Sequence, residues 1–348
     1  MEQLRLNVAL LRRRVPNLTN AAKSVGLRPA TVSNLCTGKI PVGRSEVRTL
    51  VALASLAECS LDELIMRGEK VDMIETGIKT LDVFAPLAKG GTIGLVARPG
   101  MGQLVVLAEL FYRVKQTYAK TVLLEPEAYH AEVEELKADV DRVCLSIDEA
   151  YEELAKTDSA YDVLFAADRS HVVTGEIYRL QDRLLAAGEQ HVTTLLLDLK
   201  GEAVDDDFPY GPLETLWQFD ADLAARQLFP SINPLHSTSS VLEGAHTDQT
   251  HLSIQQRAQK LLRRYYELRS FIRVGGMERL PSAEVDTYHR GERLEAYLTQ
   301  PLYVAEALTG QKGTRVNLQE ALQDVRKILE GAADHFEVAE LKYTGSIS

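Results

Sequence analysis

The sequence predicts a mixed α/β protein with a separate helical domain at its N-terminus, and three observations lead to this prediction. The apolar run TIGLVA at 92–97 is followed by a glycine-rich turn and then by apolar residues at helical spacing from Leu104 to Val114, which is the pattern of a strand, a loop and a helix. The run HVTTLLLDLKG at 191–201 is a second apolar stretch that ends in an acidic residue. The first seventy residues instead show short helical patterns, interrupted at Gly26.

Length and composition bound the remaining possibilities. A chain of 348 residues with 45% hydrophobic residues is long enough for two or three domains and a sizeable core. It has no apolar N-terminal segment of the signal-peptide type and no window near the roughly 20 apolar residues of a membrane helix. We therefore expect a cytoplasmic protein without a membrane partner. The three cysteines are too few and too scattered for a disulfide framework or a zinc site.

The net charge of −11 is unevenly distributed along the chain. Residues 1–70 hold eleven Lys and Arg against six Asp and Glu, a balance of about +5, which leaves about −16 for the remaining residues. This asymmetry predicts a basic binding module on an acidic body, with DNA as the partner of the basic module.

Capping residues, a glycine and a proline indicate where the helices of the first seventy residues begin and end. The segment LRLNVALLRRRV at 4–15 has the apolar spacing of an amphipathic helix with a basic end. In the next segment, Asn17 or Thr19 can cap a short helix, Gly26 permits a sharp turn, and Pro29 suits the first turn of a second helix. Two short helices joined by a glycine turn predict a helix-turn-helix.

Residues 4–66 resemble the Cro/CI-type (XRE-like) helix-turn-helix family. The resemblance rests on TVSNL at 31–35, the stop TGK at 37–39 and the closing segment LVALASLAECSLDELI at 50–65. It implies that the start of the second helix enters the major groove and that nearby basic residues contact phosphates. The residues it assigns to DNA binding are Arg12, Arg13, Arg14, Arg28, Thr31, Ser33, Asn34 and Lys39. Arg28 departs from the family, which has Ser or Thr as the N-cap there, and a small helical bundle that binds protein remains the alternative.

The rest of the chain resembles the catalytic beta subunit of the rotary ATP synthase over about 74–115 and 215–345. The matching segments are ETGIKTLDVFAPLAKGG at 75–91, FPSINPLHSTSS at 229–240, QQRAQKLLRRYYELRSFIRVGGMERL at 255–280, LTQPLYVAEALTG at 298–310 and VNLQEALQDVRKILEGAADHF at 316–336. This resemblance implies a RecA-like domain with a parallel sheet over 71–245 and a C-terminal helical bundle over 246–348. The family's β-barrel domain is missing, and the helix-turn-helix at 1–70 takes its place.

The segment GLVARPGMGQLVV at 94–106 stands where a phosphate loop of the form G-x-x-x-x-G-K-[ST] is expected. Ala97 replaces the first glycine, Gln103 the lysine and Leu104 the magnesium-binding hydroxyl. Without that lysine and hydroxyl, charge on the phosphoryl oxygens is not neutralised and the metal is not placed. We therefore predict a body without ATPase activity, catalytic residues, cofactor or metal, in which the loop survives as a structural turn.

Residual binding of ATP or ADP is the alternative for this body. The resemblance places Asp198 at the Walker B aspartate, Glu127 at the catalytic glutamate and Phe229 at an adenine-stacking aromatic. Other positions depart from the family, since Ser240 replaces an arginine and Leu302 and Leu308 replace aromatic residues. We favour the interpretation of Asp198 as a strand-end carboxylate and of Glu127 as an exposed acid, because a metal site needs several ligands and the loop hydroxyl is absent. The residual nucleotide site would comprise Gly100, Gly102, Gln103, Glu127, Asp198 and Phe229.

Two further basic features have open interpretations. Arg98, inside the loop, either reaches an anion or is solvated. The six basic residues within 255–274 form either a second nucleic-acid surface or a solvated helix face. Taken together, the sequence predicts a DNA-binding protein, a transcriptional regulator or DNA-organising protein, whose inactive body forms a homo-oligomer. The alternatives are a nucleotide-gated regulator and a protein-interaction partner of an ATP synthase-like assembly.

Overall fold

The computed structural model describes the chain in two compact units. The described residues are 4–7, 10–11, 14–15, 18–36, 40, 42–67, 71–117, 119–157, 161–188, 191–206, 210–211, 213–242 and 248–347, without the side chains of residues 5, 19, 20, 33, 66 and 67. The first unit takes the described residues within 1–72 and 240–249, and the second those within 73–239 and 250–348. The segments 71–245 and 246–348, expected as separate domains, thus lie largely in one compact unit.

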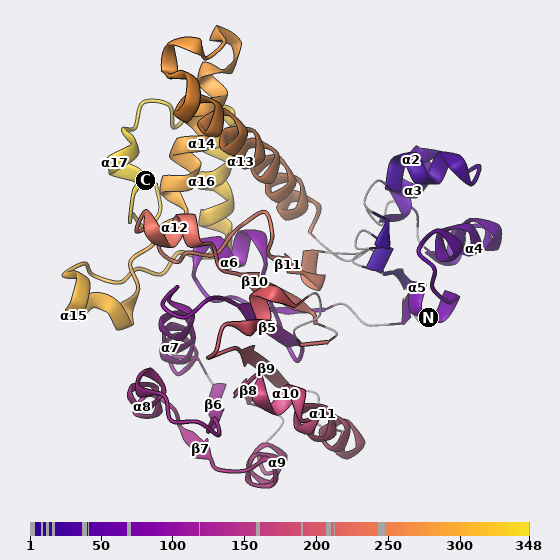
Figure 1. The fold of residues 1–348 in the computed structure, drawn as a ribbon, viewed down its shortest axis with the longest axis vertical. Helices are drawn as coiled ribbons and strands as arrows, with labels where there is room; N and C mark the ends of the chain where they lie inside the picture. The colour runs from indigo at the N-terminus through magenta and orange to yellow at the C-terminus, as the bar shows by residue number, and fades with distance from the viewer. Residues whose placement is uncertain are drawn as a thin grey trace. The chain divides into compact units, whose positions relative to one another are not determined.

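The first unit combines short helices with a two-stranded sheet (Figure 1). Strands β1 and β2 pair antiparallel, with Leu4 opposite Arg67 and Leu6 opposite Ile65. Their apolar side chains and those of the helices form one cluster, in which Leu11, Leu53 and Leu64 are fully buried. The named elements are β1 (Leu4–Leu6), α2 (Leu18–Ser24), α3 (Pro29–Cys36), the 3₁₀ turn Val42–Arg44, α4 (Val47–Leu56), α5 (Leu61–Leu64) and β2 (Ile65–Arg67).

The helix predicted over 4–15 is wrong at its start, because residues 4–6 form strand β1. Leu4 and Leu6 lie two residues apart, so both side chains point to the same face of the strand, and both join the apolar cluster. Helical structure begins only after Asn7, whose side-chain oxygen accepts the N–H of Leu10 at 3.0 Å. The partner strand lies about sixty residues further along the chain, beyond the reach of local periodicity.

Seven described strands of the second unit form one mostly parallel sheet, which confirms the α/β fold class. The strand order is β11-β10-β5-β9-β8-β6-β7, and β11 is the antiparallel member. The strands are β5 (Thr92–Val96), β6 (Ala119–Leu124), β7 (Arg142–Cys144), β8 (Asp162–Asp168), β9 (Val192–Leu197), β10 (Thr215–Gln218) and β11 (Thr238–Ser239). A separate antiparallel pair joins β3 (Met73–Ile74) to β4 (Leu87–Ala88).

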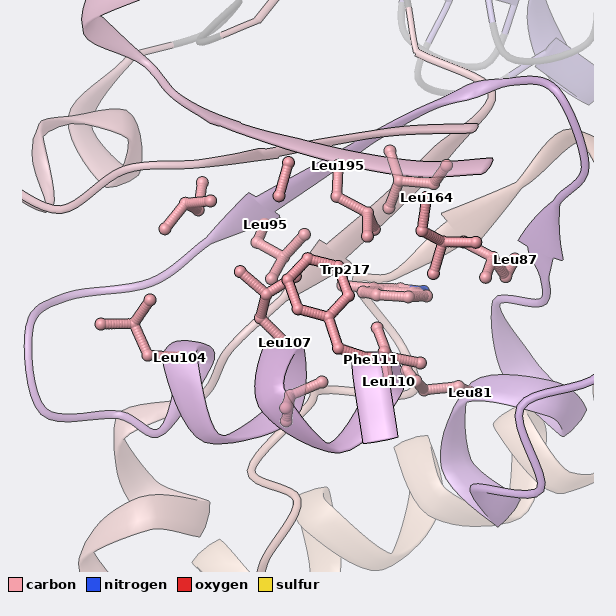
Figure 2. Packing of buried hydrophobic residues seen from close by; sticks show 14 of the residues in the cluster. Leu81, Leu87, Leu95, Leu104, Leu107, Leu110, Phe111, Leu164, Leu195 and Trp217 are labelled. Carbon is pink, nitrogen blue, oxygen red and sulfur yellow. The ribbon is translucent and has the colours of Figure 1, made fainter. Parts of the chain in front are cut away.

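Helices cover both faces of this sheet, as the nearly continuous burial of residues along β5, β6, β8 and β9 requires. On one face, Leu95 and Leu195 pack with the side chains of α7 (Gln103–Val114), among them Leu107 and Phe111, around the buried Trp217 (Figure 2). On the other face, the alternate strand residues pack against α9 (Ile147–Ala155) and α11 (Glu176–Ala187). The remaining helices of this region are α8 (Ala131–Lys137), α10 (Ser170–Val173) and α12 (Ala221–Ala225), with a 3₁₀ turn at Glu202–Asp205.

A third apolar cluster of this unit joins α6 (Lys79–Phe84) to the C-terminal helices α13 (Gln249–Gly275), α14 (Val285–Tyr297) and α16 (Leu318–Glu330), which lie side by side in Figure 1. Gly291 of α14 permits a close approach to α13, because a Cβ there would lie 2.3 Å from the Cβ of Tyr265. The shorter elements are α15 (Glu306–Thr309), α17 (Val338–Leu341) and 3₁₀ turns at Ser240–Leu242, Met277–Arg279, Ser282–Glu284 and Tyr303–Ala305.

Candidate functional site

The segment 97–102, which the sequence predicts to be a degenerate phosphate loop and which is called the phosphate loop below, connects the interior strand β5 to helix α7 at the carboxyl end of the parallel strands. Gly102 is the residue before α7 and has φ of +89°, a left-handed conformation that favours glycine. The loop thus keeps the strand–loop–helix geometry that a phosphate site uses. Binding of phosphate and magnesium at such a loop depends on the side chains of the next two residues, which here are Gln103 and Leu104.

Neither residue carries the ammonium or the hydroxyl group that a phosphate loop uses. Gln103 is uncharged, and only 5% of its surface is exposed. Leu104 is equally buried and belongs to the apolar cluster between α7 and the sheet, where Figure 2 labels it at the start of the helix. A hydroxyl at position 104 would take the place of an apolar side chain that the core now buries.

Neighbouring segments hold the loop in place. The Oγ of Ser231 donates to the carbonyl of Met101 at 2.7 Å. The sequence allows two interpretations of Arg98, as an anion ligand or as a solvated residue. In the structure, Arg98 forms an ion pair with Asp205 at 2.9 Å. Both of these side chains are at least half exposed, so the pair contributes little stability. Gly201 packs on the loop, because a Cβ there would lie 2.5 Å from the Cδ of Pro99.

Asp198 organises the chain that follows β9. The carboxylate is 3% exposed; its Oδ1 accepts the N–H of Lys200 at 3.0 Å, and its Oδ2 accepts the N–H of Ala203. Asp168, at the end of β8, has the same role, since it accepts N–H groups from Ser170 and Leu199. These contacts agree with the interpretation of Asp198 as a strand-end carboxylate rather than a metal ligand.

Glu127 and Phe229 lie on separate loops, after β6 and after α12. Glu127 is exposed, and 36% of the surface of Phe229 is exposed. The Phe229 loop lies close to the phosphate loop, because Ser231, two residues further on, is the residue bonded to Met101. Sequence reasoning missed Ser231, which carries no local signal. Gly201 could have been suspected from its place in the turn that follows an apolar strand, four residues after the end of β9.

Three of the predicted DNA-binding residues, Arg28, Thr31 and Asn34, lie at the start of α3 or within it. Arg28 is exposed and directly precedes the helix, and its carbonyl accepts the N–H of Thr31 at 2.9 Å. Thr31 and Asn34 are half-buried, while Val32 and Leu35 are each 2% exposed in the core. Helix α3 therefore has one face fixed by apolar packing. Arg12, Arg13, Lys39 and the side chain of Ser33 lie outside the described residues.

Arg14 has a structural role that the sequence did not predict. Its guanidinium donates to the carbonyls of Ala57 at 3.1 Å and Glu58 at 2.8 Å, directly after helix α4. A cation at the end of a helix satisfies free carbonyls and interacts favourably with the helix dipole. Arg14 thus stabilises the first unit.

Three of the six basic residues of α13, Arg257, Arg264 and Arg269, form ion pairs with acidic side chains. Arg264 pairs with Glu267 and Glu284 at 2.8 and 2.7 Å, and Arg269 pairs with Asp222 at 2.8 Å. Ion pairs of this kind reduce the net positive charge that a nucleic-acid surface requires. Their presence favours the solvated helix face over a second nucleic-acid surface.

The described part of the chain contains no group of three or more His, Cys, Asp or Glu side chains placed to hold a metal ion. Within the same residues, no helix combines the length and the apolar character needed to cross a membrane. No protein-family model matches the chain.

Proposed function

We propose that this chain is a DNA-binding protein whose first unit is a Cro/CI-like helix-turn-helix reader and whose second unit self-associates without hydrolysing ATP. The observation that carries the proposal is the arrangement of α2, Gly26 and α3, with Arg28 exposed at the entry to the second helix. Gly26 has φ of +75°, so the chain turns sharply between the two helices.

Packing and charge support this reader. Ala22 of α2 and Val32 and Leu35 of α3 are buried in one core, which fixes the second helix relative to the first. A helix held in this way presents its first residues to a major groove at a defined angle. The positive balance of residues 1–70 supplies the sequence-independent attraction to phosphates.

The state of the phosphate loop supports a body without ATPase activity. Gln103 brings no charge to the β and γ phosphates, and Leu104 is part of the apolar core. Both oxygens of Asp198 already accept backbone N–H groups, so its carboxylate is committed to the fold. We infer a RecA-like domain, with a helical bundle formed by α13, α14 and α16, that serves in assembly. A homo-oligomer would present several readers, and such multivalency converts weak single contacts into tight binding.

DNA binding is tested by replacing Arg28 with alanine. We expect the affinity for a fluorescently labelled duplex to fall about 5- to 10-fold, because a phosphate or base-edge contact is lost. If the contact is to a phosphate, the slope of log affinity against log salt also decreases by about 1. Fluorescence anisotropy across a salt series measures both quantities.

The matched control is Arg48→Ala, because Arg48 is an exposed arginine on α4 that pairs with Glu46. This variant should bind DNA as the wild type does, within about twofold, since exposed ion pairs contribute little. Equal losses in the two variants would indicate general charge attraction instead of a reader centred on α3. If neither variant weakens DNA binding, the result supports the alternative that the first unit is a helical bundle that binds protein.

The inactive body is tested with nucleotide. Isothermal calorimetry with Mg-ATP at millimolar concentration should give no binding heat, and the double variant Gln103→Lys/Leu104→Thr should remain without ATPase activity because Asp198 stays bonded to its own loop. The anisotropy titration should be the same with and without Mg-ATP. Binding heat together with a shift in DNA affinity would establish the nucleotide-gated regulator in place of this proposal.

A further inference from the structure

Helices α13 and α14, both labelled in Figure 1, border a charged groove of the second unit. Its lining comprises residues of α13 between Arg257 and Glu267, residues between Glu284 and Arg290 and, from α16, Leu329, and we call it the α13–α14 groove. The groove has a volume of about 690 Å³. Small-molecule sites have volumes of about 300–1,000 Å³, so an organic molecule of ordinary size fits this space.

Arg264, in this lining, is already committed to partners within the groove. Its guanidinium forms ion pairs with Glu267 at 2.8 Å and with Glu284 at 2.7 Å, which link α13 to the 3₁₀ turn before α14. Two carboxylates share this one arginine, so the three side chains together carry a net charge of −1. This part of the groove does not attract an anion.

Two further arginines of the groove are balanced by carboxylates outside its lining. Arg290 pairs with Asp334 at 2.7 Å, and Arg257 lies 3.7 Å from Glu330. A ligand gains little from either arginine, because it would have to displace an existing partner. Asp286, in the first turn of α14, adds another carboxylate to the lining.

Lys260 and Arg263 are the two cations of the groove whose charge is not offset. Both side chains are exposed and lie three residues apart on α13, so they are neighbours on one face of the helix. With Arg257 they form a row of like charges at three-residue intervals, and such neighbours repel each other. Among the residues that the structure describes, neither side chain has a hydrogen-bond or ion-pair partner. An anion bound between them would remove this repulsion.

The charge of the whole groove limits this anion to a small one. The lining has five cations and three carboxylates, and Glu330 and Asp334 raise the number of carboxylates to five. The surplus of positive charge is therefore confined to Lys260 and Arg263. An extended polyanion would also meet the carboxylates of the lining, Asp286 among them, and be repelled. A single carboxylate matches the charge of this pair without reaching the acidic side chains.

Apolar surface completes the site beside the two free cations. Leu261 of α13 and Leu329 of α16 line the groove, and both are half-buried against the apolar cluster of the C-terminal helices. An apolar wall with a few polar groups that fix orientation is typical of small-molecule sites. The combination favours a ligand that joins one anionic group to an apolar body.

We propose that the α13–α14 groove binds a small organic carboxylate. The carboxylate lies between Lys260 and Arg263, and the apolar body lies against Leu261 and Leu329. A guanidinium can donate two parallel N–H bonds to a carboxylate, and the ammonium of the lysine adds a third donor. The site uses no residue of the first unit or of the phosphate loop, so it stands or falls independently of DNA binding.

The first test is a calorimetric titration of the full-length protein with 2-naphthoate, which joins one carboxylate to a flat apolar body. We expect saturable binding at millimolar concentration. Both 2-naphthamide, which lacks the charge, and acetate, which lacks the apolar body, should bind at least about 10-fold more weakly. If 2-naphthoate does not bind, or if the amide binds as tightly, the proposal fails.

Inorganic tripolyphosphate distinguishes a carboxylate site from a phosphate site. It should bind more weakly than 2-naphthoate, because its extended charge meets the carboxylates of the lining. Tighter binding of tripolyphosphate would assign the groove to polyphosphates and contradict the proposal.

Substitutions of single cations locate the binding. Lys260→Met and Arg263→Met should each weaken 2-naphthoate binding about 5-fold, since each removes charge-assisted hydrogen bonds. The matched control is Arg273→Met, because Arg273 is exposed in the last turn of the same helix and lies outside the lining. This control should stay within about twofold of the wild type. Equal losses in all three variants, or no loss in the two groove variants, would overturn the proposal.

Leucine methyl NMR of the wild type locates the ligand without any substitution. Addition of 2-naphthoate should shift the methyl resonances of Leu261 and Leu329, which face the aromatic body, and leave those of the buried Leu110 unchanged. Shifts confined to other leucines would place the ligand outside the groove and refute the proposal.

Discussion

Replacement of Glu109 by alanine is expected to lower the free energy of unfolding by about 3–5 kcal/mol, because it leaves a buried arginine without its carboxylate. Glu109 and Arg113 lie one turn apart on α7, with 0% and 2% of their side chains exposed, and their Oε1 and Nε atoms are 2.6 Å apart. The other oxygen of Glu109 accepts the N–H of Val304 at 3.0 Å. The substitution therefore removes two interactions that water cannot replace.

Arg113 also explains why the effect should extend beyond α7. Its guanidinium donates to the carbonyls of Gly77 at 2.8 Å and Thr314 at 2.7 Å, so it ties α7 to the chain ahead of α6 and to the chain ahead of α16. Its charge lies over the ring of Tyr303, 5.1 Å from the ring centre. Loss of Glu109 would weaken the position of this arginine in all three contacts.

Urea unfolding of the variant and the wild type measures the effect. The matched control is Glu152→Ala, which breaks an ion pair with Lys156 at the same i,i+4 spacing on the surface, where the side chains are 68% and 71% exposed. This control should change stability by no more than about 0.5 kcal/mol. Equal effects of the two substitutions would mean that burial does not govern the Glu109–Arg113 pair.

The second large effect is a dependence of stability on pH that originates at Lys79. Burial lowers the pKa of this amine to about 7, against a smaller opposing effect of Asp324. In the unfolded chain the pKa is near 10.5, so the folded state binds fewer protons between pH 7 and pH 10.5. The penalty for burying the ammonium is therefore complete below pH 7 and disappears as the pH rises towards 10.5.

Comparison of the wild type with Lys79→Met isolates this contribution, because both proteins share every other titrating group. The free energy of unfolding of the wild type, relative to the variant, should rise by up to about 4 kcal/mol between pH 7 and pH 10. Denaturant titrations at several pH values measure the difference. A difference that does not change with pH would show that the amine titrates normally in the folded protein.

Much of the second unit could be predicted from local pattern. The strand at 92–96, the helix that follows the loop, and the helices α13 and α16 have periodic apolar residues, and the structure places helices and strands there. Strand β1 could not be predicted in this way, because the pairing of Leu4–Leu6 with Ile65–Arg67 depends on a partner far along the chain. Two leucines with polar neighbours fit a helix and a strand equally well.

For the candidate sites, the sequence predicts the chemistry of the side chains better than it predicts their hydrogen-bond partners. The prediction that Gln103 and Leu104 do not hold phosphate and metal depends on the chemistry of the two side chains alone. The sequence does not show that both oxygens of Asp198 accept N–H groups from residues 200 and 203, or that Arg14 caps α4. These contacts depend on where loops and helix ends meet in three dimensions. The periodicity of apolar residues does not predict such contacts.

The strand order determines when each sheet can form during synthesis on the ribosome. Strand β5, which carries the loop, pairs with β9 and β10, so neither neighbour exists until residues 192–197 and 215–218 have been made. The β1–β2 pair needs only the first 67 residues. Domains fold as units during synthesis, and pairings between distant segments form slowly. The β1–β2 sheet can therefore form before β9 and β10, the partners of β5, have been synthesised. The nascent chain therefore carries the apolar β5 without its sheet neighbours for about a hundred residues of elongation, which is the interval in which its unpaired edges are accessible to chaperones.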